Sequence, residues 1–519
     1  MTSSSFLKKL ITLLCFYGSF CQAQIITTIA GNGIGAYTGD GGPATSASFS
    51  EPQNVVVDDT GNVYVVDEDD NVIRKINSLG IINTIIGSGA IGYSGDGGQA
   101  RLAKLNSPGG AAIDRKGNIY ITDTYNHVIR KVNRLGIIST IAGHGTISGY
   151  GGDGNAATTA YLNFPEMIAV DGIGNLFITD AGNNRIRKID TFGIITTIAG
   201  TGVASYSGDG AAATLATLSY PTGIAVDTTS GIIYIGDANN NAARKIDAAG
   251  IITTFAGNGV SGYSGDGGLA KNALLNSPQG VTIDTAGSIY ISDGGNNAIR
   301  KVTVAGIIST YAGTGVAGFS GDGGPATLAK IFNPPGITVD VTGNLYIAEY
   351  YNSRVRKVSF CASPLNVSIS GTFSVCIGDS TLLTANGATT YTWSTNAVTT
   401  NTVYAKPAST SSFSVTGVNG GCIAIDSVII TVNSCGTDIS QLSNDHILIY
   451  PNPVNDLLYI KTNENISIEI YNSLGKKITQ QETGNIETQI DLINFSPGIY
   501  FLKMTDQSGI VYRRTFIKQ

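Results

Sequence analysis

The chain has 519 residues, too many for one ordinary hydrophobic core, so several domains are expected. It contains 67 glycines, only 13% charged residues and plentiful Ile, Val, Thr and Tyr, which is typical of short strands joined by tight turns. The net charge of -6 argues against a nucleic-acid-binding surface, because such a surface needs a basic stripe or patch.

The N-terminus has the pattern of a secretory signal peptide. Two lysines precede an apolar run, 10–20, and the small residue Ala23 follows it. We expect residues 1–23 to be removed by cleavage, since the run is too short to span a bilayer comfortably. A lipoprotein signal ending at Cys21 fits less well, because the bulky Phe20 stands where such signals have a small residue. No later segment has 18 unbroken apolar residues, so an integral membrane protein is not expected.

The central feature of the chain is a phrase that is repeated six times. Its second half reads P-x-G-I-A-V-D-x-x-G-N-x-Y-I-x-D-x-x-N-N-x-I-R, and a loop with Y-S-G-D-G-G-x-A comes before it. The GDG aspartates recur in steps of 56 or 57 residues, as Asp40, Asp96, Asp153, Asp209, Asp266 and Asp322. A fixed long period indicates one supersecondary unit stacked on copies of itself.

Each copy contains four runs typical of short β-strands. In the first copy these runs are 54–58, 63–66, 72–76 and 81–85, and a D-x-x-G-N turn joins the first two. The glycine of that turn suits a left-handed backbone conformation. Four antiparallel strands per copy, repeated six times, predict a six-bladed β-propeller rather than a solenoid.

The two ends of the series support a closed ring. The repeats open at 25–30 with a fourth strand and end at 354–358 with a third strand. We therefore expect the N-terminal strand to complete the sixth blade. A solenoid would need capping repeats instead, and none is visible in the sequence.

These motifs resemble the NHL-repeat family of β-propellers. The copies at 165–188 and 278–301 follow the family pattern nearly throughout, and the resemblance assigns residues 24–359 to one propeller. The Y-S-G-D-G-G-x-A loop is similar to loops in NHL propellers of extracellular adhesion and sensor proteins.

Charged residues recur at two fixed places in each copy. An acidic residue ends the second strand, and an arginine follows seven residues later on the third strand, as with Asp123 and Arg130. They could form a ring of binding groups, but sixfold repetition favours an ion pair within each blade. The GDG aspartates could suggest calcium, yet each copy offers one acidic residue among glycines, far from an EF-hand pattern. We expect no metal site in these loops, and we expect the loop aromatics, such as Tyr93, to cover gaps between blades.

Departures from the repeat are concentrated in three consecutive blades. The hairpin between strands two and three is aromatic in blade 6, acidic in blade 1, and carries a tyrosine and a histidine in blade 2. Blades 3 to 5 have Ala, Gly and Asn at these places. We expect this sector to contact a protein or carbohydrate ligand. The candidate residues are Tyr350, Tyr351, Glu68, Asp69, Asp70, Tyr125 and His127.

An enzymatic function is the alternative to binding. Some NHL-like propellers are zinc-dependent lyases or metal-dependent lactonases, and the resemblance leaves an extracellular lyase, lactonase or other hydrolase open. The mature propeller has only His127 and His144, so a three-histidine zinc site cannot form. There is no G-x-S-x-G motif either, although a carboxylate-based site along the channel stays open. Binding or adhesion without a cofactor is the interpretation that we prefer.

Residues 360–436 form a different module, followed by a linker at 437–446. It contains four cysteines, and in an exported protein these are expected to form disulfides. Three pairings are possible, of which we favour Cys376 with Cys422 and Cys361 with Cys435. Metal binding is a minor alternative because no C-x-x-C spacing occurs. The segments 376–385 and 391–393 resemble Ig-like modules of Bacteroidota surface proteins, which implies a β-sandwich around a buried tryptophan.

Residues 447–519 resemble the C-terminal sorting domain of type IX secretion. The resemblance rests on several motifs in order, including Tyr450, Pro451, Asn452 and Pro453, then Gly498 and Tyr500. It implies a small β-sandwich that the outer-membrane type IX machinery recognises. In that family the domain is usually removed as the protein is released or attached to surface lipopolysaccharide. The alternative is a plain adhesive β-domain. The whole chain is thus expected to be all-β, with a six-bladed β-propeller followed by two small β-sandwich domains.

Overall fold

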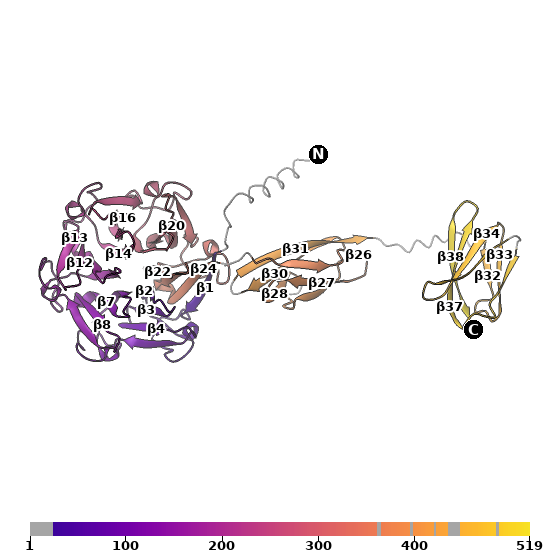
Figure 1. Cartoon of the computed structure of the whole chain (residues 1–519), viewed down its shortest axis with the longest axis horizontal. Helices are drawn as coiled ribbons and strands as arrows, with labels where there is room; N and C mark the ends of the chain where they lie inside the picture. The colour runs from indigo at the N-terminus through magenta and orange to yellow at the C-terminus, as the bar shows by residue number, and fades with distance from the viewer. Residues whose placement is uncertain (1–23, 361–364, 395–397, 420–421, 434–446, 484–486) are drawn as a thin grey trace. The chain divides into compact units, whose positions relative to one another are not determined.

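The computed structural model describes residues 24–360, 365–394, 398–419, 422–433, 447–483 and 487–519 (Figure 1). The expected signal peptide and linker lie outside these ranges, and so do Cys361 and Cys435. The chain divides into two compact units, Met1–Thr431 and Val432–Gln519.

The propeller consists of six four-stranded antiparallel sheets (Figure 1). Five of them have their strands in chain order from the central axis outward, and the sixth has the order β22-β23-β24-β1. Blades 1 to 3 are formed by β2 (Pro52–Val57), β3 (Val63–Asp67), β4 (Val72–Ile76) and β5 (Ile82–Ile86); β6 (Pro108–Ile113), β7 (Ile119–Asp123), β8 (Val128–Val132) and β9 (Ile138–Ala142); and β10 (Pro165–Val170), β11 (Leu176–Asp180), β12 (Arg185–Ile189) and β13 (Ile195–Ala199). Blades 4 to 6 are formed by β14 (Pro221–Val226), β15 (Ile233–Asp237), β16 (Ala242–Ile246) and β17 (Ile252–Ala256); β18 (Pro278–Ile283), β19 (Ile289–Asp293), β20 (Ala298–Val302) and β21 (Ile308–Ala312); and β22 (Ile337–Val339), β23 (Leu345–Glu349), β24 (Arg354–Phe360) and β1 (Gln24–Ala30).

The ring closes through the N-terminal strand. β1 pairs antiparallel with β24, with Ile26 opposite Val358, and so becomes the outer strand of the sixth blade. The closure expected from the two ends of the repeat series is confirmed. It joins the first and last segments of the propeller by backbone hydrogen bonds and leaves no blade incomplete.

The turn between the first two strands explains the D-x-x-G-N motif. In blade 1, Asp58 Oδ1 accepts hydrogen bonds from the backbone N–H groups of Thr60 and Asn62, at 3.0 and 2.9 Å. Gly61 lies between them with φ of 82°, a conformation that L-residues with a Cβ rarely adopt. The motif therefore fixes a tight turn at the end of each first strand.

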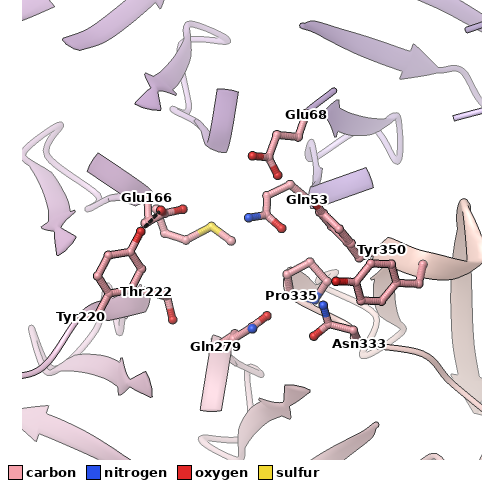
Figure 2. Close-up of a pocket in the computed structure, with 11 residues that line it drawn as sticks. Gln53, Glu68, Glu166, Tyr220, Thr222, Gln279, Asn333, Pro335 and Tyr350 are labelled. Carbon is pink, nitrogen blue, oxygen red and sulfur yellow. Dashed lines mark hydrogen bonds between the residues drawn. The ribbon is translucent and has the colours of Figure 1, made fainter. Parts of the chain in front are cut away.

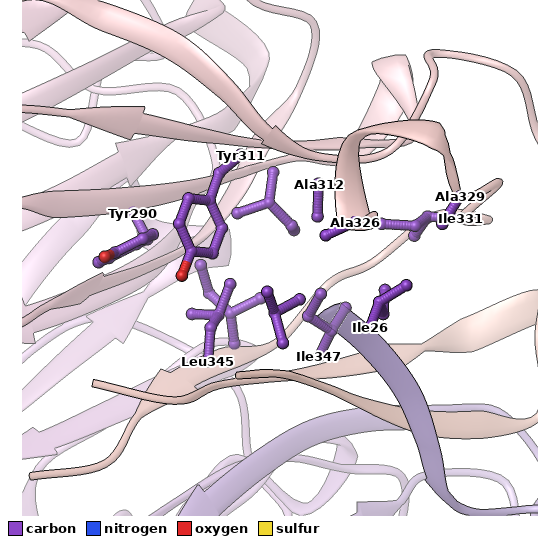
Figure 3. Close-up of a cluster of buried hydrophobic side chains, with 12 residues drawn as sticks. Ile26, Tyr290, Tyr311, Ala312, Ala326, Ala329, Ile331, Leu345 and Ile347 are labelled. Atoms are coloured by element: carbon purple, nitrogen blue, oxygen red, sulfur yellow. The ribbon is translucent and has the colours of Figure 1, made fainter. Parts of the chain in front are cut away.

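The hydrophobic core of the propeller lies between neighbouring blades. Between blades 5 and 6, Tyr290 and Tyr311 face Leu345 and Ile347, and Ile26 of β1 joins the same cluster (Figure 3). The two tyrosine rings meet edge to face with centroids 4.8 Å apart. Because each sheet buries one face against the next, no blade has a complete core by itself.

Short 3-10 helices occur at two places in the repeat. One set lies in the loops before the first strands: η1 (Ala44–Ser46), η2 (Ala100–Leu102), η4 (Ala157–Thr159), η6 (Ala213–Leu215), η8 (Ala270–Asn272) and η10 (Ala326–Leu328). The other set forms the hairpins between strands two and three in blades 2 to 6: η3 (Thr124–Asn126), η5 (Ala181–Asn183), η7 (Ala238–Asn240), η9 (Gly294–Asn296) and η11 (Tyr350–Asn352). In blade 1 the corresponding residues, 68–71, form a turn.

The second module has two facing sets of strands. The sheets are β25 (Ser368–Gly371), β27 (Thr381–Asn386) and β29 (Thr402–Ala405), and β26 (Ser374–Cys376), β31 (Cys422–Asn433), β30 (Ser411–Asn419) and β28 (Thr390–Trp393). Trp393 is buried, as expected, and its indole N–H donates to the carbonyl oxygen of Thr400 at 3.0 Å. The Ig-like assignment and the cysteine pairing stay predictions, because Cys361, Cys435 and the side chain of Cys422 lie outside the described residues.

The C-terminal unit is a small two-sheet domain. Its sheets are β32 (Ile447–Tyr450), β33 (Leu457–Thr462) and β36 (Glu487–Asp491), and β35 (Lys477–Glu482), β34 (Ile466–Tyr471), β37 (Gly498–Asp506) and β38 (Val511–Lys518). The predicted all-β architecture of a propeller and two small sandwiches is confirmed. Within the described parts of the chain, no helix has the length and apolar character that a bilayer crossing requires.

Candidate functional site

A buried arginine lies within each blade and contacts two carboxylates of the same repeat. In blade 2, Arg130 lies 3.1 Å from Asp123, at the end of the second strand, and 2.7 Å from the GDG aspartate Asp96. The equivalent groups are Arg74 with Asp67 and Asp40, Arg187 with Asp180 and Asp153, Arg244 with Asp237 and Asp209, Arg300 with Asp293 and Asp266, and Arg356 with Glu349 and Asp322. The ion pair expected within each blade is therefore present, and the GDG aspartates are its second acceptors.

An aromatic ring of the GDG loop covers each of these arginines. In blade 2 the centroid of the Tyr93 ring lies 5.1 Å from Arg130 Cζ, and its hydroxyl is hydrogen-bonded to Thr140 Oγ1 at 2.8 Å. The other rings are Tyr37, Tyr150, Tyr206, Tyr263 and Phe319, at 5.0 to 5.3 Å from their arginines. Most of the recurring polar chemistry thus belongs to one structural network per blade.

The first strands of the six blades meet around the central axis. The second residue after their initial proline is glycine in four copies, because neighbouring strands approach closely. A Cβ at Gly223 would lie 1.9 Å from the carbonyl oxygen of Gln279 in the next blade. Blades 1 and 3 instead carry Asn54 and Met167, and Asn54 Nδ2 lies 3.0 Å from Met167 Sδ. These two side chains meet across the axis.

A cavity of about 300 Å³ lies at the axis where the first strands begin (Figure 2). We call it the axial pocket. Its lining residues are Gln53 and Glu68 of blade 1, Glu166 and Met167 of blade 3, Tyr220 and Thr222 of blade 4, Gln279 of blade 5, and Asn333, Pro335, Tyr350 and Tyr351 of blade 6. None of these eleven residues is Lys, Arg or His, so the charge of the pocket wall is entirely acidic.

Glu166 and Tyr220 form a hydrogen-bonded pair on one side of the pocket. The Tyr220 hydroxyl donates to Glu166 Oε1 at 2.8 Å, as the dashed line in Figure 2 shows. Burial raises the pKa of Glu166, and the hydrogen bond from Tyr220 opposes that shift. Burial and the neighbouring Glu166 charge raise the pKa of Tyr220. Tyr220 therefore stays a hydrogen-bond donor at neutral pH and fixes one carboxylate oxygen.

Glu68 enters the pocket from the hairpin of blade 1 (Figure 2). Burial raises its pKa to about 8, with further contributions from the charges of Glu166, Asp69 and Glu51. Among the described residues, no donor is hydrogen-bonded to its carboxyl group. The pocket thus holds two acidic side chains. Glu166 is oriented by a hydrogen bond, whereas Glu68 has no such donor and lies near other acidic groups.

Aromatic rings form the opposite side of the pocket. Tyr350 and Tyr351 meet edge to face with centroids 4.9 Å apart, and Tyr351 also packs on Phe332 at 4.8 Å. The Tyr350 hydroxyl donates to Glu51 Oε2. Burial and this hydrogen bond raise the pKa of Tyr350. The blade 6 hairpin therefore presents a fixed apolar wall with a neutral hydroxyl.

Three of the seven candidate residues, Glu68, Tyr350 and Tyr351, line the pocket. Asp69 is exposed beside them, and its charge acts on Glu68. Asp70 turns into its own blade, where its carboxylate accepts a hydrogen bond from the backbone N–H of Ser50 at 3.2 Å.

The two blade 2 candidates lie outside the pocket lining. Tyr125 is 52% exposed and contacts Phe164 edge to face, at 5.1 Å between centroids. His127 is buried, and its Nδ1 accepts a hydrogen bond from the backbone N–H of Phe164 at 3.1 Å. In other blades an asparagine makes the same link, as Asn184 does with the N–H of Tyr220 at 2.8 Å. His127 therefore joins neighbouring blades, and burial lowers its pKa so that Nδ1 can accept.

Sequence reasoning missed most of the pocket wall. Glu166, Thr222 and Gln279 all occupy the x position of the P-x-G element, and Tyr220 stands just before the proline. These positions vary between copies, whereas the proline between them is present in every copy, and this variation is the signal that could have identified them. The pocket extends beyond the expected sector of blades 6, 1 and 2, because residues from blades 3, 4 and 5 also line it.

The sorting-motif residues hold the last strand of the C-terminal domain. Asn452 Oδ1 accepts from the backbone N–H of Ile517 at 2.9 Å, and its amide donates to the carbonyl oxygen of Thr515 at 3.1 Å. Tyr500 is buried against Phe516, with stacked rings 5.4 Å apart. Tyr450 ends β32, Pro451 and Pro453 flank Asn452 in the loop that follows, and Gly498 begins β37.

Comparison with solved structures supports the fold. A structural genomics protein of unknown function from Bacteroides thetaiotaomicron is 22% identical, with a TM-score of 0.50, over 65% of this chain and 76% of its own. At that identity the likeness shows the propeller fold alone.

Two sequence relatives each match more than half of this chain. The Protein SUPPRESSOR OF QUENCHING 1, chloroplastic, of Arabidopsis thaliana is 28% identical over 284 residues, 52% of this chain and 27% of that protein. Teneurin-1 of Homo sapiens is 28% identical over 390 residues, 66% of this chain and 13% of teneurin-1. The chain thus matches only a minor part of the length of these relatives.

Two families match the sequence. The Secretion system C-terminal sorting domain matches residues 448–519, which marks the chain for type IX secretion to the cell surface or the extracellular space. The Teneurin NHL domain matches residues 33–94, 91–150, 147–206, 201–263 and 259–318, together more than half of the chain. The chain therefore belongs to the NHL-repeat family that the teneurin NHL domain represents.

Proposed function

We propose that this secreted or cell-surface protein binds an extracellular protein or carbohydrate ligand in the axial pocket of its propeller. The observation that carries the proposal is the position of the pocket. The six blades repeat the same buried arginine network, whereas residues that differ between copies in blades 1, 3, 4, 5 and 6 line one cavity. Concave sites with a few convergent polar groups are the usual form of a ligand site.

Two polar groups in the pocket wall are already held in place by hydrogen bonds, which favours ligand binding. Glu166 is held by Tyr220, and the Tyr350 hydroxyl is held by Glu51, so both polar groups are oriented before a ligand arrives. Residues fixed in this way lose little conformational entropy on binding. Under the same proposal, the sorting domain brings the propeller through the type IX machinery, after which it is released or attached to lipopolysaccharide.

The proposal can be tested with the full-length secreted protein on arrays of peptides and glycans. We expect wild-type protein to bind a defined set of ligands, and Thr222→Phe, which fills the pocket, to lose them. Glu166→Gln provides a second variant that changes charge and little volume. Asp59→Asn is the matched control, because Asp59 is an exposed carboxylate in the turn after β2, at the opposite end of that strand from the pocket. Identical array patterns for wild type and both pocket variants would overturn the proposal.

A further inference from the structure

The axial pocket is lined by several hydrogen-bond acceptors and by no basic residue. Glu68 and Glu166 point into it from two different blades (Figure 2), and Glu51 and Asp69 add their charges nearby. Carboxylates placed close together repel one another unless a positive group lies between them. The protein provides an arginine for each buried acid within the blades, but none of the eleven residues around this cavity is basic.

Buried acceptors without partners add to this imbalance. Thr222 Oγ1 and Gln279 Oε1 belong to residues that line the pocket, and both atoms are inaccessible to solvent and have no hydrogen-bond partner. Asn54 is only 7% exposed and lies beside Met167 of the pocket wall, and its Oδ1 also has no partner. Buried polar atoms normally have partners, so these acceptors add to the excess of acceptors around the cavity.

We propose that the axial pocket recognises a primary ammonium group, carried by a lysine side chain of an extracellular protein partner. This inference rests on the proposed function and narrows its ligand class. An ammonium group has three donors and no acceptor, which complements a wall of carboxylates and amide and hydroxyl oxygens. The Tyr350 and Tyr351 rings suit the methylene chain of lysine and attract its charge through their faces. A neutral sugar would bring no positive charge to the two glutamates, which no basic residue of the wall neutralises.

Binding of a cation to this pocket is linked to pH through Glu68. The groups facing Glu68 are Glu166 across the pocket, Asp69 and Glu51 on neighbouring backbone, and the tyrosine hydroxyls. Because the pKa of Glu68 is raised to about 8, its carboxyl is largely protonated at pH 6 and ionised at pH 9. An ammonium ligand binds the ionised form better, so its affinity rises with pH over this range and binding releases a proton.

The sequence supplies a built-in probe for this test. Of its three methionines, Met1 lies in the expected signal peptide, Met167 lines the pocket and Met504 is buried in the C-terminal domain. In protein that comprises residues 24–519, with the sorting domain retained, and is labelled with ¹³C-methyl methionine, we titrate Nα-acetyl-lysine amide and follow both methyl signals. We expect the Met167 signal to shift in a saturable way and the Met504 signal to stay fixed. The neutral Nε-acetyl analogue should bind at least about tenfold more weakly, since a hydrogen bond between charged groups is lost.

Variants then assign the effect to the acidic wall. Glu166→Gln should weaken binding by about tenfold, whereas Asp59→Asn should leave it unchanged. Wild-type affinity should rise about tenfold from pH 6 to pH 9, and in Glu68→Gln most of this rise should disappear, with only the titration of Glu166 left to contribute. The methyl signals of each variant without ligand report whether its fold is intact.

Two results would overturn the ammonium proposal. Equal binding of the lysine amide and its neutral analogue would show that the charge is not recognised. A Met167 shift with calcium chloride or lactose but not with the lysine amide would assign the pocket to a metal ion or a sugar. Both results would leave the proposed function standing, because it fails only if the pocket variants do not affect binding on the arrays.

Discussion

Blade 1 differs from the other five blades in the hairpin that faces the pocket. In blade 2, Asn126 donates its amide to Asp123 at 2.9 Å and to the carbonyl oxygen of Gly92 at 2.8 Å. Asparagine has the same position in blades 3 to 6. In blade 1 that position is Asp70, which has no amide to donate, and the backbone N–H of Ser50 serves both Asp67 and Asp70.

The replacement of an amide by a carboxyl group changes the charge balance of the blade. Arg74 Nη1 lies 4.0 Å from Asp67, whereas Arg130 Nη1 lies 3.1 Å from Asp123. Asp67 Oδ2 is buried and has no donor. Burial and the neighbouring Asp70 raise the pKa of Asp67 well above its usual range, and burial raises the pKa of Asp70. A proton held between the two acids would restore the missing donor.

The difference between blade 1 and the other blades shows how one copy of a repeat can contribute a special residue to the axial pocket. Five blades keep the amide and with it a compact 3-10 turn, and they present small residues or tyrosines there. Blade 1 has Asp70 in place of the asparagine. Its hairpin forms a turn at 68–71 without a 3-10 helix, and Glu68 of this turn lines the pocket. Strained or unpaired groups at a ligand site are commonly compensated by the rest of the fold.

The largest expected contrast is between the two equivalent aspartates, Asp123 and Asp67. Asp123→Asn removes one member of a buried ion pair at 3.1 Å, so we expect a loss of about 3 kcal/mol in the free energy of unfolding. Asp67→Asn removes an acid that is 4.0 Å from its arginine and supplies an amide donor to Asp70, so we expect a change below about 1 kcal/mol. Urea unfolding of the full-length protein, followed through the propeller transition, measures both. Equal losses in the two variants would show that blade 1 is no different.

A smaller effect is expected from restoring the amide of blade 1. Asp70→Asn should raise the free energy of unfolding by about 1 to 2 kcal/mol at pH 7, because it pairs the buried Asp67. Since both pKa values are raised in the folded state, the native protein holds more protons than the unfolded chain. The contribution of Asp67 and Asp70 to the free energy of unfolding of the wild type is therefore present at low pH and is lost as pH rises through their raised pKa values. The gain of the variant over wild type should be near zero at pH 4 and largest at neutral pH.

The reverse exchange in blade 2 is the matched control. Asn126→Asp should destabilise the propeller at pH 7 by a similar amount and should become less harmful as pH falls. Thermal unfolding at several pH values checks both variants. A pH-independent difference in either variant would contradict the shared-proton account of blade 1.

Much of the fold could be predicted from the sequence because the same pattern of strand and turn residues occurs six times. The period fixed the number of blades, and the unmatched strand at 25–30 predicted the closure through β1 that the structure shows. The intra-blade ion pair followed from the seven-residue spacing between Asp123 and Arg130. The second carboxylate, Asp96, did not follow, because 34 residues separate it from Arg130 and only the folded loop brings them together.

The candidate site was predictable only in part. Glu68, Tyr350 and Tyr351 could be identified because they differ from the repeat pattern in the hairpin between strands two and three. The propeller fold predicts that these hairpins of all six blades lie on the same face. Glu166 and Tyr220 did not stand out, because the x position of P-x-G and the position before its proline both vary throughout the repeat. Their importance comes from the convergence of six first strands at the axis, which is a tertiary property. His127 breaks the phrase as well, but its ring nitrogen replaces the asparagine oxygen of other blades.

The smallest expected effect concerns the outer loops, where blade 1 and blade 2 are alike. The hydroxyl of Tyr37 is hydrogen-bonded to Thr84 at 2.6 Å, and that of Tyr93 to Thr140 at 2.8 Å, with the rings 5.3 and 5.1 Å from their arginines. Tyr37→Phe and Tyr93→Phe each keep the ring over the guanidinium and remove one partly exposed hydrogen bond. We expect each to lower the free energy of unfolding by about 0.5 kcal/mol. Urea unfolding in parallel should give equal shifts, because the irregularity of blade 1 is confined to its inner hairpin. A clearly larger loss for Tyr37→Phe would mean that the acids of blade 1 weaken the whole blade.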